Sequence, residues 1–283
     1  MGEGEGLTSE TEHGDERPKS TLNTIGALLR SLATATLTGF LAGVIAGGIG
    51  SRIAMRIVAM TAGDADQGAI TDAEATVGEI TAGGTILLLF LGGFVGALGG
   101  LIYLALQSWL AEAGRWRGLA FAVLLLMLFG SGIIDDANSD FRRFGSTALN
   151  VAMFAALFVG FGLLVPPFFE WFRTFLPRAS LHQSGLGALA AYAFGLVLLP
   201  PALLSVGVAA QESITIRPLL LYVLVVVPIA SVRLARSAGR FERLSDLREH
   251  RNAMGAACLV LALPVLVGVV LDVRALVNIF ETA

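Results

Sequence analysis

The chain has 283 residues and is 55% hydrophobic but only 14% charged, with a mean hydropathy of +0.77. Soluble domains carry about 25% charged residues, so this composition excludes a soluble globular enzyme and predicts a polytopic membrane protein. The formal net charge of -3 does not indicate a nucleic-acid partner. The single cysteine, Cys258, excludes both a disulfide framework and a thiolate metal cage within one chain.

The first part of the chain is polar and acidic. Residues 1–20 contain six acidic side chains against Arg17 and Lys19, and they show no apolar periodicity. Low hydrophobicity combined with charge is typical of disorder, so we expect a disordered, acidic, cytoplasmic tail over residues 1–22. We expect residues 23–280 to form a single helical domain.

Seven apolar stretches follow, and each is close to the roughly 20 residues that a helix needs to cross a bilayer. They cover residues 31–50, 82–106, 118–134, 147–169, 185–210, 218–235 and 253–271. Helices are expected because lipid offers no partner to unpaired backbone groups. The sequence therefore predicts an all-α, polytopic integral membrane helix bundle with about seven transmembrane helices.

Proline pairs interrupt the fourth and fifth stretches, at Pro166–Pro167 and Pro200–Pro201. A proline inside a helix removes a backbone donor and bends the helix unless its neighbours compensate. Bent helices suit a moving transporter, but they are also ordinary in static membrane bundles.

The basic residues are unevenly divided between the two sides of this predicted bundle. If the N-terminus is cytoplasmic, 13 of the 19 lysines and arginines fall on the inner side. Cytoplasmic loops of membrane proteins carry the excess of positive charge. We therefore expect the N-terminus inside and the C-terminus outside, in a bacterial-type cytoplasmic membrane.

Two glycine ladders give the clearest packing signal. Glycine recurs at every fourth residue in the first and second stretches, at Gly39, Gly43 and Gly47 and at Gly92, Gly96 and Gly100. Small residues at this spacing allow two helix backbones to approach closely. Since the two helices are consecutive, we expect a tight hairpin within one chain, and the alternative is a contact face between two copies.

Charged residues gather on the predicted outer side of the first four helices. Arg52 and Arg56 are one helical turn apart, on a face that we expect to lie opposite the glycine ladder. We predict a ligand-binding face there, at Arg52, Arg56, Glu79, Asp135, Asp136, Asn138, Asp140, Arg142 and Arg143. One form of this site is an anionic lipid head group held by Arg52, Arg56, Arg142 or Arg143. Either the arginines and aspartates pair across the first and third helices, or they face head groups and water separately.

The loop before the second stretch carries oxygen ligands at alternating positions around Gly68. The run from Asp64 to Glu74 resembles an EF-hand loop with one residue missing, because its Gly and last Glu fall at positions 5 and 11 rather than 6 and 12. A divalent-cation site at Asp64, Asp66, Asp72 and Glu74 is one interpretation, and a solvated acidic loop is the other.

The run from Asp135 to Asp140 resembles the aspartate-rich motifs that bind magnesium diphosphate in membrane prenyl-transferring enzymes. Magnesium bridges carboxylates to phosphate oxygens, so paired aspartates one turn apart suit it. The resemblance covers six residues, and no second motif of this kind accompanies it. It implies a metal-dependent membrane transferase that uses Asp135, Asp136 and Asp140.

The loop over residues 233–251 is the strongest basic feature. Arginines recur in it at three- and four-residue spacing, at Arg233, Arg236, Arg240 and Arg243. Such a stripe on an amphipathic helix can lie on the anionic inner leaflet and bind lipid head groups. The alternative is that these charges only enforce the topology.

These observations leave three classes of function open. The leading interpretation is a non-catalytic scaffold, binding or sensing protein with a charged outer face. The second is a small-solute or lipid transporter, and the third is the metal-dependent transferase. No cofactor is predicted apart from the divalent cation. The expected partners are the bilayer, anionic lipids at the cytoplasmic face, and a second copy of the chain or another membrane protein.

Overall fold

The computed structural model describes residues 16–61, 68, 81–130, 146–176, 186–204 and 265–281. These ranges are helical apart from short turns and helix ends, and they contain no strand. The elements in chain order are α1 (Glu16–Gly43), η1 (Val44–Ile49), α2 (Gly50–Thr61), α3 (Ala82–Leu110), η3 (Ala111–Trp116), α4 (Arg117–Phe129), α6 (Thr147–Phe175) and α7 (Leu186–Val197). Residues 199–204 and 265–281 are also helical.

Three helical stretches in these ranges are long and apolar enough to cross a membrane: Gly26–Thr61, Ala82–Phe129 and Thr147–Phe175. A shorter apolar helix covers Ala190–Leu204. The described part of the chain is therefore nearly all-helical with three candidate membrane-spanning helices, which fits an integral membrane protein. Of the seven stretches expected from the sequence, residues 218–235 lie outside the described ranges. Three more are described only in part: 118–134 to residue 130, 185–210 over residues 186–204, and 253–271 from residue 265.

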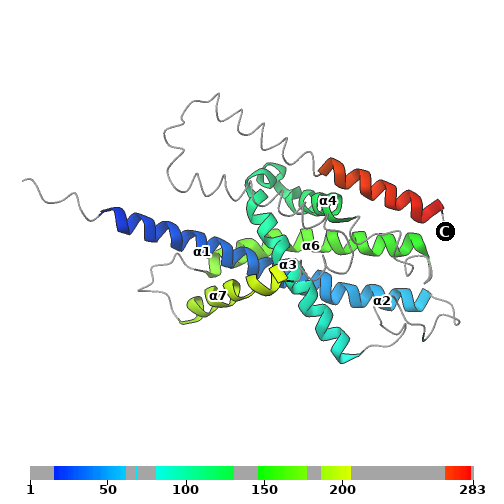
Figure 1. Ribbon diagram of the computed structural model, residues 1–283, viewed down its shortest axis with the longest axis horizontal. Helices are drawn as coiled ribbons and strands as arrows, with labels where there is room; N and C mark the ends of the chain where they lie inside the picture. Colours follow the sequence, from blue (N-terminus) through cyan, green and yellow to red (C-terminus); the bar gives the residue numbers. More distant parts are fainter. Residues whose placement is uncertain are drawn as a thin grey trace, which may run out of the picture.

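α1, η1 and α2 form one continuous rod (Figure 1). The rod begins at Glu16, inside the tail that we expected to be disordered, and it ends at Thr61, well beyond the expected helix end at residue 50. Pro18 does not prevent the early start, because it falls in the first turn, where backbone N–H groups have no helical partner. Within the rod, η1 is π-helical, so each turn takes more residues than the 3.6 of an α-helix.

α3 and α4 meet at a corner. Thr81 caps the start of α3, since its side-chain oxygen accepts a hydrogen bond from the N–H of Gly84 at 3.2 Å. At the other end, α3 passes into the 3-10 stretch η3, in which Gly114 has a φ of 54°. Glycine adopts a positive φ without steric cost, so this residue turns the chain into α4.

The two proline pairs have different effects on their helices. α6 continues through Pro166–Pro167, and the carbonyl of Gly162, which Pro166 cannot bond, lies 3.0 Å from the position of a Cβ on Gly118 of α4. α7 ends at Val197, just before Pro200–Pro201, and helical structure resumes after a single turn residue. A proline pair therefore interrupts only the shorter of the two helices.

The described helices pack around a shared core. α3 runs antiparallel to α1 and crosses the middle of the rod, α6 lies beside α1 and α4, and α7 lies against α1 (Figure 1). Tyr103 of α3 is buried between Phe121 of α4 and Phe169 of α6, with edge-to-face ring contacts at 5.2 and 5.3 Å. The C-terminal helix, residues 265–281, lies against the end of α4, where Gly268 contacts the backbone of Met127.

Candidate functional site

The two glycine ladders lie face to face where α1 and α3 cross. A Cβ added to Gly39 would overlap the carbonyl oxygen of Gly96 and lie 2.7 Å from the nitrogen of Gly100, and one added to Gly43 would overlap the carbonyl oxygen of Gly92. The backbones therefore touch directly, which favours dispersion and weak Cα–H···O contacts. We refer to this contact as the glycine crossing, with members Gly39, Gly43, Gly47, Gly92, Gly96 and Gly100.

A buried threonine joins a third helix to the same region. Thr36 of α1 is fully buried, and its hydroxyl donates a hydrogen bond to the carbonyl oxygen of Gly195 in α7 at 2.8 Å. Thr38 is equally buried, but its hydroxyl meets no hydrogen-bond partner within the described part of the chain. A hydrogen bond between membrane helices contributes about 0.6 to 1.7 kcal/mol to stability. Thr36 makes such a bond and Thr38 makes none to the described residues, so substitutions at the two residues separate its contribution from that of burial.

Arg52 contacts the start of α3, which differs from the expectation. Its Nη2 lies 2.7 Å from the position of a Cβ on Gly84, beside the Thr81 cap. Its buried Nε has no hydrogen-bond acceptor among the residues that the structure describes. We expected Arg52 to face away from the glycine ladder, whereas it reaches the same helix that the ladder contacts. The expectation assumed 100° per residue, and the π-helical η1 advances by less than that, which turns Arg52 toward α3.

The rest of the predicted ligand-binding face is largely outside the described residues. Arg56 is exposed one turn beyond Arg52 on α2. The members outside the described ranges are Glu79, Asp135, Asp136, Asn138, Asp140, Arg142 and Arg143. Pairing of arginines and aspartates across the first and third helices therefore stays a prediction.

The predicted cation site and the basic stripe also lie outside the described ranges. These are Asp64, Asp66, Asp72 and Glu74 for the cation, and Arg233, Arg236, Arg240 and Arg243 for the stripe. Gly68, within the EF-hand-like run, is an exposed turn residue with a φ of 81°. Elsewhere in the described ranges, no three His, Cys, Asp or Glu side chains gather as a metal site would require.

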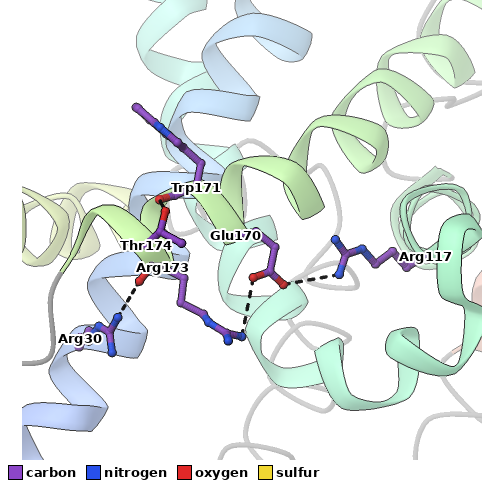
Figure 2. Close-up of polar contacts among 6 residues, drawn as sticks. All are labelled: Arg30, Arg117, Glu170, Trp171, Arg173 and Thr174. Atoms are coloured by element: carbon purple, nitrogen blue, oxygen red, sulfur yellow. Dashed lines mark hydrogen bonds and ion pairs between the residues drawn. The ribbon is translucent and has the colours of Figure 1, made fainter.

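Figure 2 shows a charged cluster that the sequence analysis missed, which contacts α1 at Arg30, 22 residues before Arg52 on the rod. Glu170 of α6 lies between Arg117, at the start of α4, and Arg173, one turn further along α6. The Nη1 atoms of Arg117 and Arg173 are 3.5 and 3.7 Å from the two carboxylate oxygens of Glu170. All three side chains are more than one-third exposed, and exposed ion pairs of this kind add little to stability.

Arg30 joins this cluster from α1. Its Nε donates a hydrogen bond to the carbonyl oxygen of Leu176 at 2.7 Å. Its Nη2 donates one to the carbonyl oxygen of Arg173 at 2.6 Å (Figure 2). These carbonyls end α6 and have no helical partner, and a cation is favourable at a helix C-terminus. Arg30 therefore caps α6. We refer to Arg30, Arg117, Glu170 and Arg173 as the arginine cluster.

Only part of the arginine cluster has a signal in the sequence. The charge distribution assigns its three arginines to the same side of the membrane, and Glu170 and Arg173 have the spacing of a helical ion pair. The hydrogen bond from Arg30 to Arg173 joins residues 143 positions apart. No local pattern predicts a contact at that separation.

No protein-family model, curated protein or solved structure matches this chain. Two regions of the described structure bear on function: the glycine crossing and the arginine cluster.

Proposed function

We propose that the chain is a seven-helix integral membrane protein that acts without catalysis, as a scaffold or binding protein with a charged outer face. The observation that carries the proposal is the backbone-to-backbone contact of α1 and α3 at the glycine crossing. Close-packed contacts have discrete arrangements and resist gradual sliding. A pair of helices packed in this way suits a fixed platform better than a path that opens and closes.

The arginine cluster supports the proposed orientation, with the N-terminus in the cytoplasm. It joins the middle of α1 to the start of α4 and the end of α6. The charge distribution assigns its arginines, Arg30, Arg117 and Arg173, to the inner side. Arg52, 22 residues further along the rod than Arg30, then belongs to the outer side. That is where we expect the ligand-binding face.

Cysteine labelling in intact cells tests this orientation. The variants Asp66→Cys and Arg240→Cys, each in a Cys258→Ser background, are treated with a maleimide that cannot cross the membrane. We expect position 66 to be labelled from outside and position 240 only after permeabilisation. The reverse pattern would move the predicted ligand-binding face to the cytoplasm and refute the proposed orientation.

Reconstitution into sealed liposomes tests the non-catalytic function. A scaffold is expected to show no saturable uptake of amino acids, sugars or inorganic ions, and no magnesium-dependent transfer between diphosphate and acceptor lipids. The diagnostic variant is Asp136→Asn. Saturable uptake that this substitution abolishes would replace the scaffold by a transporter, and magnesium-dependent turnover that it abolishes would replace it by a transferase.

A small-solute or lipid transporter is the second candidate, and η1 is the observation that favours it. π-helical stretches occur frequently at functional sites, and this one lies inside the longest apolar part of the rod. It also sets the orientation of Arg52, whose buried Nε lacks an acceptor in the described ranges. In a transporter, this stretch would be the place where the rod bends.

A further inference from the structure

We propose that the arginine cluster binds the phosphate of an anionic phospholipid. Arg117 and Arg173 hold the phosphate, and Glu170 is the internal anion that the phosphate replaces. This proposal goes beyond a scaffold function, and it rests on the proposed function only in requiring that the chain is inserted in a bilayer.

The guanidinium groups of Arg117 and Arg173 keep most of their hydrogen-bonding capacity. Each carries five N–H donors, yet each approaches Glu170 with one nitrogen at 3.5 or 3.7 Å, beyond the usual hydrogen-bond range of about 2.7 to 3.2 Å. Their side chains are 37% and 61% exposed. Arginine binds phosphate bidentately, so a phosphate between them would form contacts that the carboxylate of Glu170 does not reach.

The described residues at this end of the bundle carry an excess of positive charge. The arginines outnumber the carboxylates, with Arg30, Arg115, Arg117 and Arg173 against Glu112 and Glu170. Arg30 is committed to the end of α6, and the guanidinium of Arg115 lies 5.1 Å from the ring centroid of Trp116. Arg117 and Arg173 are therefore the two arginines that are available to an anionic ligand.

Aromatic side chains indicate that the cluster lies at the depth of lipid head groups. Trp116 and Trp171 are 57% and 54% exposed, and both are sequence neighbours of cluster arginines or of Glu170. Tryptophan concentrates at the boundary between hydrocarbon and water. The candidate spanning helix Thr147–Phe175 ends at this cluster, and α3 turns into α4 beside it. A lipid phosphate is the anion that occupies this depth.

The protein's own tryptophans provide a local readout. The chain contains three, and Trp109, Trp116 and Trp171 all lie near the α3–α4 corner or in the last turns of α6. Brominated phospholipids quench tryptophan only at short range, so quenching reports which head group occupies this end. The full chain is reconstituted into phosphatidylcholine vesicles that contain either brominated phosphatidylcholine or brominated phosphatidylglycerol. We expect the anionic lipid to bind at least fivefold more tightly than the neutral one.

Single substitutions test whether the arginine cluster causes the preference for the anionic lipid over the neutral one. Arg117→Gln and Arg173→Gln should each weaken it about fivefold, which corresponds to about 1 kcal/mol per basic residue at an anionic surface. Glu170→Gln should strengthen the preference, because it removes the competing carboxylate. Arg274→Gln is the matched control, since it removes the same charge from an exposed position on the C-terminal helix, which lies against the far end of α4.

Each contrary outcome identifies a different failure. Equal quenching by the two lipids, or an unchanged preference in both arginine variants, would overturn the head-group site and leave membrane insertion intact. Displacement of brominated phosphatidylglycerol by millimolar inorganic phosphate would replace the lipid with a soluble anion as the ligand. Quenching by neither lipid would overturn bilayer insertion, and with it the proposed function.

Discussion

The glycine crossing and the arginine cluster join helices in opposite ways. At the crossing, α1 and α3 touch backbone to backbone, and each contact depends on the absence of a side chain. At the cluster, the ion pairs are formed by long side chains that are more than one-third exposed. Dispersion weakens steeply with distance, whereas an exposed ion pair is flexible and screened by salt. The crossing therefore fixes the fold, and the ion pairs of Glu170 with Arg117 and Arg173 are free to exchange partners.

The largest change in the free energy of unfolding is expected when a side chain is added to a glycine of the glycine crossing. A Cβ on Gly96 would overlap the carbonyl oxygen of Gly39 and lie 2.6 Å from the Cα of Gly43. Because no rotamer change relieves a clash with backbone, we expect Gly96→Ala to lower the free energy of unfolding by about 3 kcal/mol. Denaturant titration in detergent micelles measures this.

Gly83 provides the control for this substitution. It lies in the first turn of the same helix, with open space where a Cβ would be. Gly83→Ala should leave stability unchanged or raise it, because alanine favours a helix over glycine by about 1 kcal/mol. Equal losses in the two variants would show that close packing does not stabilise the crossing.

Arg30 is the member of the arginine cluster with a structural role, because it bonds the carbonyls at the end of α6. Arg30→Gln removes two charge-assisted hydrogen bonds to the end of α6. We expect a loss of about 2 kcal/mol and faster amide exchange over the last turn of α6. Arg115→Gln, at an exposed arginine of η3, is the control: it should cost at most about 1 kcal/mol through its contact with Trp116 and leave amide exchange in α6 unchanged.

A smaller effect is expected at the contact between α1 and α7. Thr36→Val removes the hydrogen bond to Gly195 and should lower the free energy of unfolding by about 1 kcal/mol. Thr38→Val removes a buried hydroxyl without a partner in the described ranges, so stability should be unchanged or increased. The same denaturant titration compares the two, and a larger loss for Thr38→Val would contradict the assignment.

The smallest change in stability is expected at Glu170. Its ion pairs with Arg117 and Arg173 are long and exposed, so Glu170→Gln should change the free energy of unfolding by less than about 0.5 kcal/mol. The difference should disappear at high salt. A loss comparable to that of Gly96→Ala would show that the cluster holds the fold, and the contrast between the two regions would fail.

Local features of the chain were predictable from the sequence, because a membrane-spanning helix needs a local apolar stretch. The expected segments 82–106 and 147–169 fall within α3 and α6. Glycine spacing is also a local signal, and the ladder residues lie where α1 and α3 touch. The ends of the first helix were predicted less accurately, since the rod begins at Glu16 and ends at Thr61. Hydropathy marks the apolar part of a helix, and the helix continues beyond that part at both ends.

Features that depend on distant or irregular structure were not predictable. The orientation of Arg52 depends on the π-helical η1, and the spacing of apolar residues does not predict a π-helix there. The cap that Arg30 provides to α6 depends on how three helices meet. The sequence therefore predicted a binding site among the charged residues near Arg52, whereas the cluster that the structure describes forms around Arg30 and the end of α6.

The length of the α1–α2 rod determines how the protein meets the two surfaces of a bilayer. Gly26–Thr61 has 36 residues and measures about 54 Å, against a hydrocarbon thickness of about 30 Å. A tilt of about 40° shortens its projection only to about 41 Å. Arg30 and Arg52 are 22 residues apart, or about 33 Å, which matches that thickness. If the rod spans a bilayer of this thickness, its Arg30 and Arg52 side chains would reach opposite surfaces and the last turns of α2 would extend into the aqueous layer. A thinner membrane would then increase the tilt of the rod.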